Sequence, residues 1–185
     1  AFNIHFAPPN GLPTPNSLDS YILTRRKQEA PDFDNGLHDP AGHTVRQVIG
    51  KGVDDSSSRQ GIGFAFSYGG KVFTSCTVDS NGWIRFEGSF SGSSYNNSTA
   101  YQANSAAMLF IWWQDLRTAH DGYVRTWSFG DVGSRVRVFE WRNYTVYTQS
   151  QSDNLTFTLQ ICLHEKDGGI VYRFGPLEKR GNTNK

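Results

Sequence analysis

Hydrophobic residues alternate with small or polar residues in the stretch that organises the chain. Residues 62–66 read Ile-Gly-Phe-Ala-Phe, and this period of two is typical of a strand with one buried face. Residues 72–78 are rich in the β-branched and aromatic side chains that strands favour. Asn81-Gly82 then supplies the positive φ angles that a tight hairpin turn needs. The pattern predicts a three-stranded meander over residues 62–86.

The second half of the chain continues this strand pattern. Residues 123–129 and 135–141 both alternate, and the glycine-bearing segment between them predicts a hairpin. Residues 155–164 and 170–174 form a second such pair, and residues 106–116 are apolar enough for a buried strand. The good helix formers never gather into a periodic run. The sequence therefore predicts an all-β fold, an antiparallel two-sheet β-sandwich of the jelly-roll type with long loops.

The predicted strand over residues 135–141 has two different faces. Val136, Val138 and Glu140 point to one side of the sheet, because side chains alternate along a strand. The aromatic Phe139 and Trp141 point to the other side, together with two arginines.

The N-terminal stretch combines one apolar strand with a proline-rich arm. Phe2, Ile4 and Phe6 alternate as in a short strand, and four prolines over residues 8–15 then hold the chain extended. Two interpretations stay open. The strand either completes the sheet of a neighbouring copy by strand addition, or packs on its own domain.

The 185 residues are most economically one domain. We expect an N-terminal segment packed on the domain, a sandwich core and a polar tail at residues 1–59, 60–176 and 177–185. The net charge is +1, and lysine and arginine are spread along the chain, so we expect no nucleic-acid partner. No apolar run is long enough to span a membrane.

Cysteines and glycosylation sequons bear on where the protein works. Cys76 and Cys162 both lie in predicted strands, and either a disulfide or two buried thiols fits the pattern. The chain contains four Asn-X-Ser/Thr sequons, at Asn96, Asn97, Asn143 and Asn154. Together with a surface rich in hydroxyl and amide side chains, they favour a secreted or cell-surface glycoprotein.

A long loop rich in glycine, serine and asparagine follows Phe86. It carries Phe90, Tyr95 and Tyr101. Loops of this length are often functional, and aromatic rings among small polar residues suit sugar stacking or an adaptable contact surface. This loop is the predicted ligand or partner surface, and a glycan-binding, lectin-like module is one interpretation of it.

Candidate metal and catalytic groups are few. Asp32 and Asp34 resemble the start of a calcium loop, but the glutamate that such a loop needs at its twelfth position is absent. We interpret them as a turn and expect no cofactor, with calcium as the alternative. Asp115 and Glu140 form the one carboxylate pair worth considering for a glycosidase. Neither a G-x-S-x-G elbow nor an H-E-x-x-H motif occurs, so we do not expect the protein to be an enzyme.

Five motifs follow one another in a telling order. The chain reads GFAFSYGG, VDSNGWIRF, WWQDL, VFEW and finally LQICLHEKDGGIVYRFG. This order resembles the nidogen-like (NIDO-type) extracellular β-sandwich module and its bacterial cell-surface relatives. The matching positions are Asn81, Gly82, Phe86, Trp113, Asp115, Glu140, Trp141, Gly169 and Gly175. Phe110-Ile111 departs from the pattern, because relatives usually have Ala-Pro there.

The resemblance implies a noncatalytic extracellular module for adhesion or for matrix or filament assembly. It gives the matching residues a structural role. Partners would be other extracellular proteins, copies of the chain itself, or glycans. It also implies a further strand after the last hairpin, which motivates the strand-addition interpretation of the N-terminus.

Overall fold

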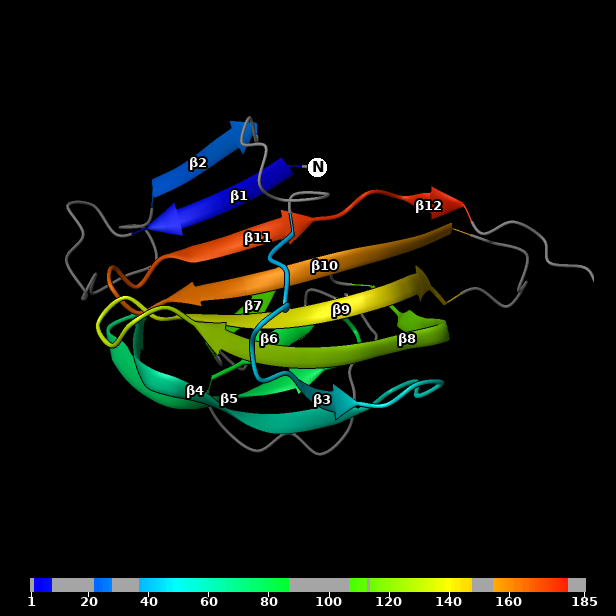
Figure 1. Cartoon of the computed structure of the whole chain (residues 1–185), viewed down its shortest axis with the longest axis horizontal. Coiled ribbons are helices and arrows are strands. Elements are labelled where there is room, and N and C mark those ends of the chain that lie inside the picture. The colour runs from blue at the N-terminus through cyan, green and yellow to red at the C-terminus, as the bar shows by residue number, and fades with distance from the viewer. Residues whose placement is uncertain are drawn as a thin grey trace, which may run out of the picture.

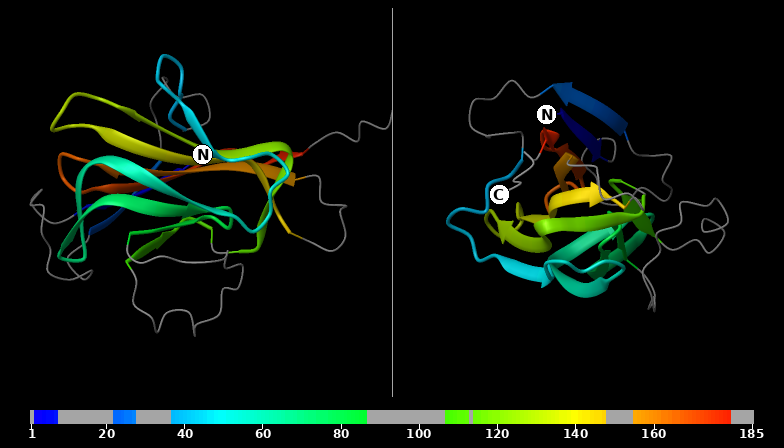
Figure 2. Two further views of the ribbon diagram at one scale, coloured as in Figure 1. Left: turned by 90° about the horizontal axis from the view of Figure 1, so that it is seen from below. Right: turned by 90° about the vertical axis from the view of Figure 1, so that its right-hand side faces the viewer.

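The computed structural model describes residues 2–7, 22–27, 37–86, 107–112, 114–147 and 155–179, and of the first two ranges only the backbone. Among these residues there are twelve strands and no helix. They form two antiparallel sheets that pack face to face, so the predicted all-β sandwich is confirmed (Figures 1 and 2).

The larger sheet has the strand order β2-β1-β11-β10-β9-β8-β3. Its strands are β1 (Phe2–Ala7), β2 (Ile22–Lys27), β3 (Arg46–Ile49), β8 (Leu116–Phe129), β9 (Val136–Val146), β10 (Leu155–His164) and β11 (Ile170–Phe174). The short strand β12 (Glu178–Lys179) pairs with the start of β10, within the predicted polar tail. Since β1, β2 and β3 belong to this sheet, the sandwich includes segments before residue 60.

The smaller sheet has the order β4-β5-β6-β7. Its strands are β4 (Ser57–Tyr68), β5 (Lys71–Asp79), β6 (Trp83–Arg85) and β7 (Met108–Phe110). The first three are the predicted meander. Figure 1 shows β6 and β7 behind β8 and β9, and β4 and β5 below β8.

The core lies between the facing sides of the two sheets. Ile62 and Phe66 from β4 pack in one buried cluster with Trp141 and Leu159 from the larger sheet. Trp141 also donates its indole N–H to the Asp79 carbonyl oxygen at 2.7 Å, so the sheets are joined by a buried hydrogen bond as well as by apolar contact.

The two faces of β9 are arranged as the sequence predicts. Phe139 and Trp141 belong to the core between the sheets. Val136 and Val138 belong to a second, smaller cluster with Trp127. This second cluster lies on the opposite face of the larger sheet.

Of the two interpretations of the cysteines, the structure shows the second, because both thiols are free and buried. Cys76 packs in the core between the sheets. In β10, Ile161 and Leu163 face this core, so Cys162 faces away from it and joins the outer cluster. The two thiols therefore lie on opposite sides of the larger sheet.

The N-terminal strand pairs within its own chain. β1 runs antiparallel to β11, with register from Phe2 opposite Phe174 to Phe6 opposite Ile170. β2 pairs with the other side of β1 and forms the edge of the sheet (Figure 1). This arrangement corresponds to the interpretation in which the strand packs on its own domain. Donation to a neighbouring copy stays a prediction.

Candidate functional site

Asn81 joins three segments of the chain at one end of the sandwich. It lies fully buried in the turn between β5 and β6. Its side-chain amide donates to Asp55 Oδ1 at 3.0 Å, and its side-chain oxygen accepts the Leu116 N–H at 2.7 Å. Its own N–H donates to Asp79 Oδ1 at 2.9 Å. Asn81 therefore holds the loop before β4 and the start of β8 in place.

Gly82 lets the same turn touch the segment that precedes β8. Its φ is +75°, and its carbonyl oxygen accepts the N–H groups of Ile111 at 3.0 Å and Trp112 at 3.4 Å. A Cβ atom at this position would lie 2.5 Å from the Trp112 carbonyl oxygen. Only glycine fits both the backbone angle and the close approach.

Three carboxylates meet just outside this turn. Asp54, Asp55 and Asp115 have ligand atoms that all lie within 4.8 Å of one another. The pKa of Asp115 is raised, first by burial and then by the negative charges of Asp54 and Asp55. Oxygen ligands of this kind suit a hard cation such as calcium. Exposed acidic groups also gather without one, so we assign no metal to this group.

Sequence reasoning found one member of this acidic group. Asp115 came from the family-like motif, whereas Asp54 and Asp55 lie in the loop between β3 and β4. The two consecutive aspartates were the one sequence feature that could have indicated this acidic group. They lie about 60 residues before Asp115, so the sequence did not show that the three side chains come together.

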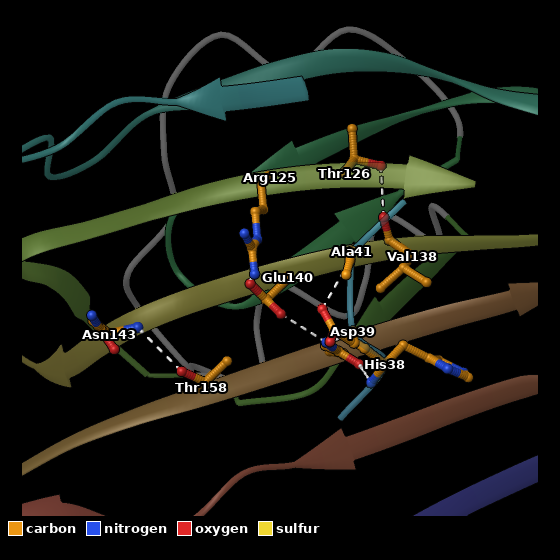
Figure 3. A network of polar contacts seen from close by, with 10 residues as sticks. His38, Asp39, Ala41, Arg125, Thr126, Val138, Glu140, Asn143 and Thr158 are labelled. Atoms are coloured by element: carbon orange, nitrogen blue, oxygen red, sulfur yellow. Dashed lines mark hydrogen bonds and ion pairs between the residues drawn. The ribbon is translucent and has the colours of Figure 1, made fainter. Parts of the chain in front are cut away.

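A buried row of polar side chains crosses the outer face of the larger sheet. Arg125, Glu140 and Gln160 are cross-strand neighbours on β8, β9 and β10. Arg125 Nε lies 2.6 Å from Glu140 Oε1, and Gln160 Nε2 lies 2.7 Å from Glu140 Oε2 (Figure 3). Glu140 is 2% exposed, so both of its oxygens are engaged in a site that solvent barely reaches.

Gln160 also fixes the segment 37–45, which crosses the outer face of the larger sheet (Figure 1). Its amide accepts the His38 N–H at 2.8 Å and donates to the His38 carbonyl oxygen at 2.9 Å. The ring of His38 meets Phe129 edge-on, with 4.7 Å between ring centroids. Burial, with smaller contributions from Arg173 and two other histidines, lowers the pKa of His38 to about 3. The His38 ring is therefore neutral at pH 7.

The structure does not bring the considered catalytic pair together. Leu116 pairs with Val146, so Asp115 lies beside Tyr147, and its carbonyl oxygen accepts the Tyr147 N–H at 2.8 Å. Glu140 lies on β9, seven residues before Tyr147, which directly follows this strand, and is therefore roughly 20 Å away at the rise of an extended chain. Glycosidase carboxylates lie within about 10 Å of each other. Glu140 is moreover held by Arg125.

Three further family-like residues that the structure describes make contacts within the fold. Phe86 stacks with Phe66 and with Phe73. Gly169 donates its N–H to Asp167 Oδ1 at 2.8 Å in the turn after β10. Gly175 donates its N–H to the Thr158 carbonyl oxygen at 2.9 Å. All of these contacts lie within the chain, and the structural role that the resemblance implies for these residues stays a prediction.

Several predicted residues lie outside the part of the chain that the structure describes. They are the loop aromatics Phe90, Tyr95 and Tyr101, the motif residue Trp113, the sequon residues Asn96, Asn97 and Asn154, and the calcium candidates Asp32 and Asp34. The fourth sequon residue, Asn143, lies in β9 with φ +51°, and its backbone N–H contacts the Thr158 hydroxyl at 3.3 Å. Its glycosylation stays a prediction.

Comparison with known families places the chain. A family model described as NIDO related matches residues 33–185. The chain therefore belongs to the NIDO-related family, and the resemblance seen in its motifs is confirmed. The comparisons with curated proteins and with solved structures gave no match. Among the residues described, no helix is long and apolar enough to cross a membrane.

Proposed function

We propose that the chain is a noncatalytic binding module of a secreted or cell-surface protein, with a role in adhesion. Membership of the NIDO-related family carries this proposal, since the family suggests an extracellular module. The use of the conspicuous polar residues supports it. Three of them are buried, and their side-chain hydrogen bonds join strands and loops of the same chain: Asn81, Glu140 and Gln160.

The pairing of β1 supports a module that is complete in one chain. Filament assembly by strand addition would place β1 on the β11 strand of a neighbour. In the structure that edge is taken by the chain's own β1, over five consecutive residue pairs. Adhesion through the surface of a self-contained sandwich therefore fits the geometry better than exchange of the first strand.

Solution mass separates these two roles. We expect the full chain to be a monomer of 20.7 kDa at every concentration when measured by light scattering. Deleting residues 1–9 removes β1 and uncovers the β11 edge, so the shortened chain should associate. Strand-exchange assembly predicts the reverse, namely a full chain that grows with concentration and a deletion that stays monomeric. That outcome would contradict the adhesive role and support a role in filament assembly.

Adhesion itself can be measured with coated beads. Beads that carry the monomeric chain should be retained on a surface coated with extracellular matrix proteins. Retention no greater than that of albumin-coated beads would contradict the proposed role.

A further inference from the structure

Residues 37–45 cross the outer face of the larger sheet in front of β10, β9 and β8 (Figure 1), and we call them the strap. At its start, Leu37 lies beside Gly175, because a Cβ atom on that glycine would be 3.1 Å from Leu37 Cδ1. The next residue, His38, packs its ring on Phe129, the last residue of β8. The strap therefore reaches from the end of β11 to the end of β8 before it enters β3.

The strap covers Cys162, which belongs to the outer apolar cluster. Gln160, Cys162 and His164 point to the same side of β10, because side chains two residues apart share a face. The Gln160 side chain holds the His38 backbone, and His164 is close enough for its charge to act on the His38 ring. His38 therefore lies over Cys162, between the two residues that flank it on the strand. This cover explains why a thiol on the outer face of the sheet is fully buried.

The charged groups that act on the His38 ring are basic. Burial is the largest cause that lowers the pKa of His38 to about 3, and the charges of Arg173, His164 and His43 lower it further. Arg173 lies on β11 directly opposite Gln160, so it shares the outer face with the strap. A proton on His38 in the closed strap would therefore be buried beside a permanent positive charge, and that arrangement is unfavourable.

The carboxylates around the strap are engaged with other groups. Glu140 on β9 is held by Arg125 on β8 and by Gln160 on β10. Asp39 on the strap itself accepts the Ala41 N–H at 2.9 Å (Figure 3). The turns after β8 and β10 carry further acids that are exposed or engaged: Asp131 in solvent, Glu165 with Arg135, and Asp167 with the Gly169 N–H.

We propose that the strap is an acid-released cover of the outer face of the larger sheet. At neutral pH the His38 ring is uncharged and the strap lies closed over Cys162. When His38 takes up a proton, its charge is solvated only after the strap has left the sheet, so acid favours the released form. Release uncovers the outer apolar cluster. This conformational device goes beyond the adhesive role and does not depend on it.

The pH range of the release follows from two pKa values of His38. In the closed strap the pKa is about 3, and in a released strap it returns to the ordinary value of about 6.5. The closed form is therefore fully favoured above about pH 6.5, and it loses stability as the pH falls towards about 3. Between about pH 7.5 and about pH 5, the ratio of released to closed strap should rise about 30-fold.

Hydrogen exchange of the strap measures this ratio in the full chain. The His38 amide donates to Gln160 Oε1 at 2.8 Å, so it exchanges only when the strap is released. Its exchange rate is compared with that of the same sequence as an unstructured peptide at the same pH, which gives a protection factor. The protection factor should fall about 30-fold between about pH 7.5 and about pH 5.

Three variants assign the effect to His38. His38→Phe keeps an aromatic ring against Phe129 but cannot take up a proton, so its protection factor should change less than about threefold over this range. His38→Gln removes the same proton site with a smaller side chain, in case the phenylalanine does not fit. The matched control is His43→Gln, which removes the exposed histidine of the same strap and should keep most of the 30-fold change.

Thiol labelling distinguishes release of the strap from unfolding of the whole sandwich. Release uncovers Cys162, whereas Cys76 stays in the core between the two sheets. A pyridyl disulfide reagent has a good leaving group and reacts with thiols in acid as well. At about pH 5 we expect Cys162 to react well before Cys76, with the modified thiol identified by peptide mass analysis.

Either of two results would overturn the proposal. The first is a protection factor of the His38 amide that does not fall in acid, or that falls as far in both His38 variants as in the natural chain. The second is reaction of Cys76 as fast as Cys162, because the whole sandwich would then open and the strap would not be a separate cover.

Discussion

Replacing Gly82 by alanine should destabilise the protein by about 3 kcal/mol or more. The positive φ costs a side-chain-bearing residue roughly 1–2 kcal/mol. The added Cβ would also lie 2.5 Å from the Trp112 carbonyl oxygen, which is backbone and cannot turn aside. The turn and the 111–112 segment must then separate, which weakens the two hydrogen bonds that the Gly82 carbonyl oxygen accepts. Urea unfolding of the purified variant measures the loss.

Gly69→Ala is the matched control for this change. Gly69 also has a positive φ, of +57°, but a Cβ atom there would meet nothing within 4 Å. Gly69→Ala should therefore lose only the stability that the positive φ costs, about 1–2 kcal/mol. Equal losses for the two variants would show that the contact between the turn and Trp112 contributes nothing.

Glu140→Leu should cost about 3–5 kcal/mol, the usual result of removing one partner of a buried ion pair. The side chain of Arg125 is 12% exposed and would keep its charge without the carboxylate that faces it. Gln160 would lose the acceptor of one N–H and would hold the His38 backbone less firmly. Loss of this anchor should also speed hydrogen exchange at the His38 amide.

The double variant Arg125→Leu with Glu140→Leu separates charge from packing. Replacing both partners of a buried pair by apolar residues is often neutral or stabilising, so the double variant should recover most of the loss. Thermal and urea unfolding of the two single variants and the double variant complete the cycle. A double variant as unstable as Glu140→Leu would contradict the buried-pair account.

The strands were predictable from local pattern, because one buried face imposes a period of two. This period located the meander of β4, β5 and β6 and separated Val138 from Phe139 on β9. The same rule, applied to β10, puts Cys162 with Gln160 and opposite Ile161. What it could not supply was which face of each strand meets the second sheet.

Contacts between distant segments were not predictable from one sequence. Gln160 holds His38 across 122 positions, and Leu116 is held by Asn81 across 35. In both pairs, the sequence around one residue gives no indication of the residue that it contacts. The group of Asp54, Asp55 and Asp115 shows the same limit, since Asp115 was found by motif and the other two by structure. Likewise, the sequence did not show that β1 pairs with the edge of β11 in its own chain.

Disulfide trapping of β1 tests most directly whether the sandwich is complete in one chain. Phe2→Cys with Phe174→Cys places thiols on directly opposite residues of β1 and β11, within the range that a disulfide spans. The native Cys76 and Cys162 are almost fully buried and should not interfere. Leu155→Cys with Lys179→Cys, across β10 and β12, is the within-chain control.

After mild oxidation and denaturation, the self-contained account predicts one result for both cysteine pairs. Each should give a single disulfide-closed chain of 20.7 kDa, with no larger species at any protein concentration. Disulfide-linked dimers or ladders from the Phe2 and Phe174 pair alone would contradict it. They would show that the first strand of each chain pairs with its neighbour.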